Sequence, residues 1–138
     1  MRLGKDRKIE LIRKVPLFSK LSKSGLQEVA SIADEIDLPE GKDLTREGER
    51  GREFVVLLEG KAEVRKGGRR INALGEGDFL GEIALVTKQP RTATVTTTTT
   101  VRALVITDRD FSELIRRSPQ VGQGVMEALA ERLAPELS

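Results

Sequence analysis

Two residues of opposite charge, Glu82 and Arg91, flank a short apolar run from Ile83 to Val86. Gly81 stands close before this run, which is long enough for one or two helical turns. Free backbone N–H groups at the start of such a helix can bind an anion, and a glycine lets the anion approach closely. The guanidinium of Arg91 can bind two phosphate oxygens at once, while ionised Glu82 can only accept hydrogen bonds, as from a sugar hydroxyl. The pattern is typical of a site for a ribose phosphate.

The same residues also have a purely structural interpretation. Acidic residues are common in the first turn of helices, and Arg91 could simply pair with Glu82. A short Gly-Glu-apolar run is therefore weak evidence for a binding site on its own. The rest of the sequence is needed to choose between the binding and the structural interpretation.

The composition removes many kinds of chemistry. The 138 residues contain no Cys and no His, so thiolate and imidazole metal ligands, a cysteine nucleophile and a Ser-His pair are all missing. Catalysis by a carboxylate or a Lys remains possible, but Asp78 and the stretch that follows it have no catalytic partner that we can identify, so we expect no enzyme, no metal site and no cofactor. The net charge of +2 is too balanced to indicate nucleic-acid binding, although the first 14 residues hold six Lys and Arg against two acids. No apolar run approaches the roughly 20 residues of a membrane helix, so we expect a cytoplasmic protein.

Hydrophobic periodicity predicts helices at both ends of the chain and short strands between them. The helices are expected at residues 5–15, 23–32 (capped by Ser22), 108–117 and 119–134, the last ended by Pro135. Strands are expected at 35–38, 43–46, 53–58, 61–66, 70–74, 92–99 and 101–107, with a hairpin at Gly67-Gly68. About eight short strands with glycines every ten residues or so favour a sandwich, a barrel or a jelly roll.

The stretch 77–95 resembles the phosphate-binding cassette of the cyclic nucleotide-binding domain family, found in catabolite-activator-type regulators, cyclic-nucleotide-dependent kinases and gated channels. The resemblance lies in Phe79–Leu85 and Pro90–Val95, and it extends to Val15–Phe18, Gly41, Glu47–Glu49, Gly60, Gly77-Asp78 and Phe111. It covers residues 10 to 134 or so. It implies one domain over 1–138: N-terminal helices (1–34), an eight-stranded antiparallel β jelly roll, or double-stranded β-helix (35–107), and C-terminal hinge and lid helices (108–134).

The resemblance also implies a role for individual residues. Glu82 would hold the ribose 2′-hydroxyl, and Arg91 would pair with the cyclic phosphate. Backbone N–H groups would complete the anion site, and some side chains would line the base and sugar. The N–H groups are those of Ile83, Ala84 and Thr92 or Ala93, with Gly81 beside them; the lining residues are Val64, Ile71 and Leu74, and Arg132 in the last helix is a candidate lid contact. For the lining residues and Arg132, an ordinary core or solvated position is an equally good interpretation.

The function implied by the resemblance is a regulatory module that binds cyclic AMP, or cyclic GMP, and transmits occupancy through its C-terminal helices. A Thr at position 92 favours cyclic GMP in some members of the family. The partners would be the nucleotide and an effector protein or a second copy of the chain, with no direct DNA binding and no membrane segment. Two alternatives remain: a domain of the same fold that binds no nucleotide and mediates protein interactions, or the sensor fragment of a transcription regulator.

Overall fold

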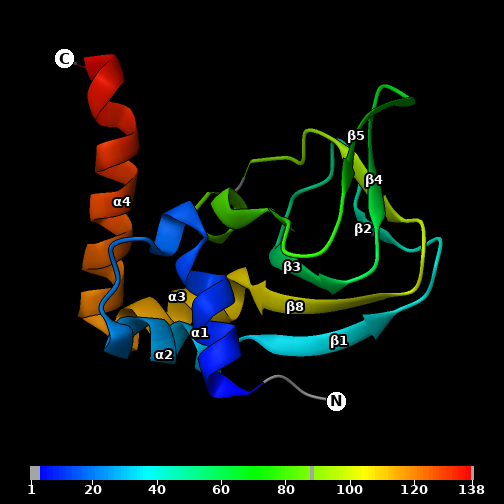
Figure 1. The fold of residues 1–138 in the computed structure, drawn as a ribbon. Helices are drawn as coiled ribbons and strands as arrows, with labels where there is room; N and C mark the ends of the chain where they lie inside the picture. Colours follow the sequence, from blue (N-terminus) through cyan, green and yellow to red (C-terminus); the bar gives the residue numbers. More distant parts are fainter. Residues whose placement is uncertain (1–3, 88, 138) are drawn as a thin grey trace. The chain divides into compact units, whose positions relative to one another are not determined.

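The computed structural model describes residues 4–87 and 89–137, with only the backbone described for Ile83 and residues 132–137. The chain forms two compact units. One comprises Met1–Ala33 and Arg109–Ser138, and the other comprises Asp34–Asp108. The first unit is helical and the second contains the strands. In Figure 1 the helical segments are blue at the N-terminal end and orange to red at the C-terminal end, and the strands run from cyan through green to yellow.

The helical unit is built from amphipathic segments that pack through one apolar core. Its elements are α1 (Lys5–Arg13), the 3₁₀ turn η1 (Pro16–Phe18), α2 (Lys23–Ser31), α3 (Asp108–Arg117) and α4 (Pro119–Leu137). The hydroxyl of Ser22 caps α2 by accepting from the N–H of Gly25 at 3.1 Å, as expected for serine at this position. The rings of Phe18 and Phe111 lie 5.8 Å apart and are both fully buried. These contacts join the N-terminal and C-terminal helices into one core.

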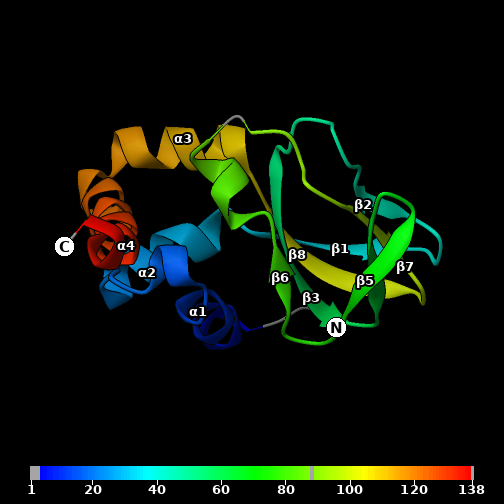
Figure 2. The same ribbon diagram turned by 90° about the horizontal axis from the view of Figure 1, so that it is seen from above.

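The strand unit contains two antiparallel four-stranded sheets, in the orders β1-β8-β3-β6 and β2-β7-β4-β5 (Figures 1 and 2). Inward-facing residues of both sheets, such as Val55, Ala62, Val95 and Ala103, form the core between them. The prediction of a mainly β fold with flanking helices is confirmed. The strands are β1 (Asp34–Leu38), β2 (Asp43–Thr45), β3 (Glu53–Glu59), β4 (Ala62–Lys66), β5 (Arg69–Leu74), β6 (Phe79–Leu80), β7 (Thr94–Thr97) and β8 (Val101–Thr107), with the 3₁₀ turn η2 (Glu82–Leu85) after β6.

Three local expectations were wrong. Helix α4 continues through Pro135 to Leu137. Proline has a φ fixed at about −65°, which is compatible with helical backbone, so the last residues keep helical dihedrals although Pro135 cannot donate a helical hydrogen bond. The short strand β6 was missed because two residues carry no periodic pattern. The expected strand at 92–99 is limited to Thr94–Thr97. There Thr97 is buried, and its hydroxyl is satisfied because it donates to Pro39 O at 2.7 Å and accepts from Lys42 N at 2.8 Å.

Within residues 4–87 and 89–137, none of the helices combines the length and the apolar character that crossing a lipid bilayer requires.

Candidate functional site

Strand β3 fixes the position of Gly81. The N–H of Gly77 donates to Leu57 O at 2.8 Å, and the N–H of Leu57 donates to Asp78 O at 2.9 Å. Strand β6 then pairs with β3 so that Leu80 lies opposite Val55. This register brings Gly81 against the carbonyl of Glu53, with a φ of +81° that residues other than glycine rarely adopt.

A second set of backbone bonds fixes Arg91. Its N–H donates to Glu49 O at 2.7 Å, and its carbonyl accepts from the N–H of Gly48 at 2.9 Å. A bridge between Arg50 and Pro90 continues this pairing. The loop 46–51 and the segment 90–91 therefore form one hydrogen-bonded unit, and the main chain of Arg91 cannot shift without breaking it.

The side chain of Arg91 lies in a narrow slot between two glycines. A Cβ built on Gly51 would come within 2.6 Å of Arg91 Cζ, and one built on Gly81 would overlap the Arg91 guanidinium and meet Glu53 O. Arg91 Nη2 donates to the carbonyl of Glu53, a backbone contact that the sequence did not indicate. Burial lowers the pKa of Arg91, and the nearby Glu53 carboxylate partly opposes this shift. Arg91 still carries its charge, since guanidinium groups do not lose their proton in proteins.

Two adjoining pockets open beside this slot. Gly81, Arg91 and Thr92 line both of them. The first, of about 270 Å³, is lined in addition by Glu82, Ala84, Thr87, Gln89 and Pro90. The second, of about 220 Å³, is lined in addition by Thr45, Val64, Leu74, Phe79, Leu80, Ala93 and Val95. The residues that line only the first pocket are mainly polar, and those that line only the second are mainly apolar, so the two are called the polar and the apolar pocket below. Taken together they reach the roughly 300–1,000 Å³ of small-molecule sites.

Most of the residues named from the sequence therefore meet at these two pockets, with some exceptions. Ile71 is 57% exposed on the β4–β5 hairpin and lines neither pocket. The N–H of Ala84 already donates to Gly81 O at 3.1 Å, and η2 is a single 3₁₀ turn, so its dipole is weaker than that of the expected helix. The side chains of Ile83 and Arg132 lie outside the described residues.

Sequence reasoning missed several lining residues. Thr87 and Gln89 lie in the loop between η2 and Arg91, so their proximity could have been inferred from the shortness of that loop. Gly51 and the carbonyl of Glu53 lie some forty residues before Arg91 and carry no local signal.

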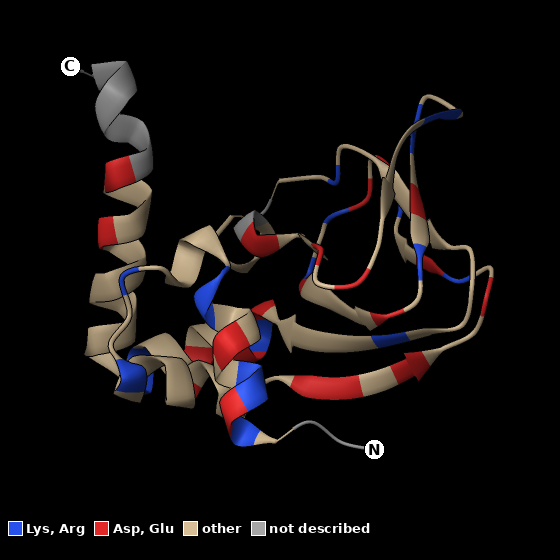
Figure 3. Cartoon of the chain, viewed as in Figure 1, with Lys and Arg blue, Asp and Glu red and all other residues tan. Residues whose placement is uncertain are grey.

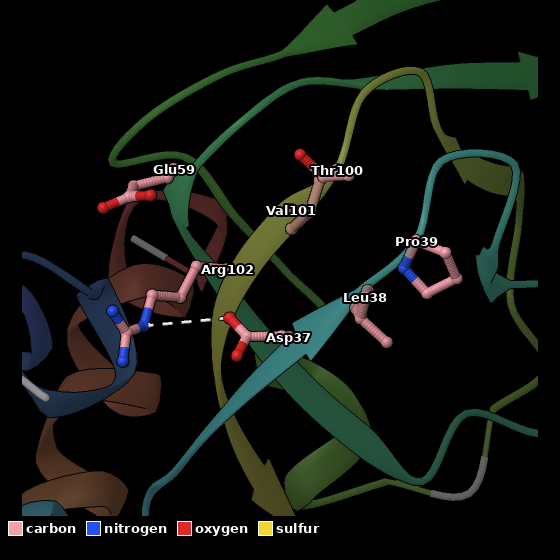
Figure 4. A pocket seen from close by; sticks show the side chains of 7 residues that line it. All are labelled: Asp37, Leu38, Pro39, Glu59, Thr100, Val101 and Arg102. Atoms are coloured by element: carbon pink, nitrogen blue, oxygen red, sulfur yellow. Dashed lines mark ion pairs between the residues drawn. The ribbon is translucent and has the colours of Figure 1, made fainter. Parts of the chain in front are cut away.

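A larger pocket of about 360 Å³ lies at the other end of β3 and β8, between β1 and the start of β8 (Figure 4). Its guanidinium, on Arg102, is held by Glu35 at 3.2 Å and by Asp37 at 4.0 Å, and Glu59 adds another carboxylate. Strand β1 carries several acidic residues in Figure 3. This surplus of negative charge repels an anion, so the pockets beside Arg91 are the better site for a phosphate despite their smaller volumes.

No three carboxylates or other ligating side chains among the described residues gather closely enough to hold a metal ion. The described site thus offers one guanidinium, one carboxylate from Glu82, hydroxyl groups and an apolar wall. This set suits a ligand that carries a phosphate, a sugar and a flat apolar ring.

The sequence model of the "cyclic nucleotide-binding domain" matches residues 35–118, more than half of the chain. The chain belongs to the cyclic nucleotide-binding domain family. The match includes both pockets and the whole of the strand unit except its first residue.

The curated relatives described here are longer proteins, and this cyclic nucleotide-binding domain is similar to only part of each. The chain is 37% identical to a cAMP-dependent protein kinase regulatory subunit of Mycosarcoma maydis, covering 88% of this chain and 23% of that protein. It is 33% identical to a cyclic nucleotide-gated potassium channel of Rhizobium etli, covering 89% of this chain and 34% of the channel. The chain thus spans about a third or less of the curated relatives it matches here.

Solved structures with related sequences also share the fold of this chain. The N-terminal domain of a transcriptional regulator from Streptomyces coelicolor superposes with a TM-score of 0.80 at 29% identity, covering 91% of this chain and 92% of that one. The regulatory domain of Toxoplasma gondii PKA, solved with cAMP, gives a TM-score of 0.72 at 27% identity and covers 80% of this chain and 44% of that one.

Proposed function

We propose that this domain binds cyclic AMP in the two pockets beside Arg91 and acts as a regulatory sensor rather than as an enzyme. The observation that carries the proposal is the Arg91 guanidinium, held in a glycine-lined slot at the junction of a polar and an apolar pocket. A singly charged cyclic phosphate would meet this guanidinium, which can bind two of its oxygens in parallel.

Each pocket would then take one part of the nucleotide. Glu82 lines the polar pocket with Arg91, where its carboxylate would accept a hydrogen bond from the ribose 2′-hydroxyl. Val64 and Leu74 are half-buried and line the apolar pocket, where they would pack against the base. Thr92 lines both pockets, and its hydroxyl would contact either the phosphate or the base.

Cyclic AMP is proposed ahead of cyclic GMP because of the relatives. The kinase regulatory subunit of Mycosarcoma maydis is named for cAMP, and the Toxoplasma gondii domain was solved with cAMP. A cGMP-dependent protein kinase of Eimeria tenella is 29% identical, so both nucleotides belong in the test. We expect cyclic AMP to bind more tightly than cyclic GMP.

Thermal unfolding with added nucleotide tests the proposal. A ligand present at 100 times its dissociation constant stabilises the folded state by about 2.7 kcal/mol, which raises the melting temperature by several degrees. Cyclic AMP should give this shift, and 5′-AMP, whose phosphate is open and doubly charged, should give much less. If neither cyclic nucleotide raises the melting temperature, the proposal is wrong, and a protein-interaction module of the same fold becomes the next hypothesis to test.

We further propose that nucleotide occupancy alters the helices at residues 108–134, which would pass the signal to an effector or to a second copy of the chain. Ligand can change these helices only by binding more tightly to one of their states. Hydrogen exchange measured with and without cyclic AMP would test this. Changed protection of α3 and α4 amides supports the proposal, and protection changes confined to residues 77–95 contradict it.

A further inference from the structure

The slot that holds Arg91 depends on Gly51, a residue with no role in the sequence-based site. Gly51 is buried, and it is not one of the glycines with positive φ, so its backbone conformation does not by itself call for glycine. What excludes a side chain there is Arg91. A Cβ at position 51 would lie 2.6 Å from Arg91 Cζ and 2.7 Å from Cδ, well inside van der Waals contact.

We propose that Gly51 is a positioning residue for the phosphate-binding arginine: its missing side chain provides the space in which Arg91 is held. This inference rests on the proposed function of the same site. The two glycines of the slot are required for different reasons. Gly81 is required by its own φ of +81°, whereas Gly51 is required only by the side chain that lies against it.

The surroundings leave Arg91 little room to adapt. Its Cδ, in the middle of the side chain, is among the atoms that a Cβ at position 51 would meet, so a rotation of the guanidinium alone does not relieve the overlap. The loop cannot readily widen either, because Gly48 and Glu49 bond to the main chain of Arg91 at 2.9 and 2.7 Å. An alanine at position 51 should therefore expel the whole side chain from the slot and break its bond to Glu53 O.

The affinity test uses Gly51→Ala with Gly75→Ala as a matched control. Gly75 also lacks a positive φ, and a Cβ built there meets no atom within 4 Å. We expect Gly51→Ala to weaken cyclic AMP binding by about tenfold or more, because it displaces a charge-assisted contact. Gly75→Ala should bind like the wild type. Wild-type affinity in Gly51→Ala, measured alongside a wild type that binds, would overturn the proposal.

A second readout needs no ligand. In the wild-type background, Gly51→Ala should lower the denaturant midpoint of unfolding. In the Arg91→Ala background the space is empty, so the same change should leave the midpoint unchanged or raise it slightly, because alanine restricts the unfolded chain. An equal loss in both backgrounds would show that position 51 acts without Arg91 and would refute the proposal. If the wild type binds no nucleotide, the proposed function fails, but this cycle still decides whether Gly51 holds the arginine.

Discussion

Replacing Arg91 with alanine removes the guanidinium that lines both proposed ligand pockets. The slot between Gly51 and Gly81 restricts this side chain before ligand arrives, so little ordering remains to be done on binding. Loss of a preorganised charge-assisted pair leaves the phosphate partly desolvated and unpaired, which costs about 2–4 kcal/mol of binding free energy. At about 1.4 kcal/mol per factor of ten, the dissociation constant should rise roughly 30- to 800-fold.

The same substitution should change the folded state less. Without ligand, the charged guanidinium donates to Glu53 O, and a hydrogen bond from a charged group is worth about 1.5–3 kcal/mol. Burial of the charge, which lowers its pKa, offsets part of that gain. The free energy of unfolding should therefore fall by about 1–2 kcal/mol, less than the loss of binding free energy. A loss of affinity that exceeds the loss of stability is the expected signature.

Calorimetric titration with cyclic AMP and urea unfolding measure the two quantities on the same protein. Arg69→Ala is the control, because Arg69 is exposed on β5 and lines neither pocket. It should keep wild-type affinity, apart from a small loss of long-range attraction. An Arg91→Ala protein that binds as tightly as Arg69→Ala would refute the assignment of the phosphate to Arg91.

Three further predictions concern other residues. Glu82→Gln should weaken binding of cyclic AMP more than binding of its 2′-deoxy analogue, and equal losses for the two would remove Glu82 from the ribose role. Gly60→Ala should lower the free energy of unfolding by about 3 kcal/mol, because Gly60 has a φ of +95° and an added Cβ would overlap Thr100 O; a urea midpoint equal to that of Gly75→Ala would contradict this. The pKa of Asp43 is lowered chiefly because the Thr96 hydroxyl donates to it at 2.6 Å. Its ionised form therefore stabilises the fold above the usual carboxyl pKa of 3.8, and this contribution is lost as the pH falls through the lowered value. Asp43→Asn should flatten the pH dependence of stability below that pKa, and an unchanged slope in urea unfolding would exclude the mechanism.

Much of the architecture was predictable because it depends on local patterns. Ser22 caps a helix where its side chain type predicts a cap, and Gly67-Gly68 turns a hairpin with both φ angles positive. Alternation along the strands and the glycines between them indicated a β fold of short strands. The residue types and spacing of Gly81, Glu82 and Arg91 likewise indicated an anion site.

The details that were not predictable depend on distant neighbours. Gly51 matters because Arg91 lies against it, and no pattern near position 51 reports that. The partner of Arg91 is a backbone carbonyl, which every residue has, so its identity at Glu53 has no signature in the sequence. Ile71 is apolar and on a strand, yet it is exposed because β5 is the outer strand of a projecting hairpin (Figure 1).

Calorimetric titration of the wild-type chain with cyclic AMP, cyclic GMP and 5′-AMP would test directly whether the pockets beside Arg91 bind a cyclic nucleotide. We predict one site per chain with a dissociation constant in the micromolar range or below for a cyclic nucleotide, equivalent to a binding free energy of about −8 kcal/mol or better. Binding of 5′-AMP should be much weaker. If no cyclic nucleotide binds more tightly than about 1 mM, or if 5′-AMP binds equally well, the pockets beside Arg91 are not a cyclic nucleotide site.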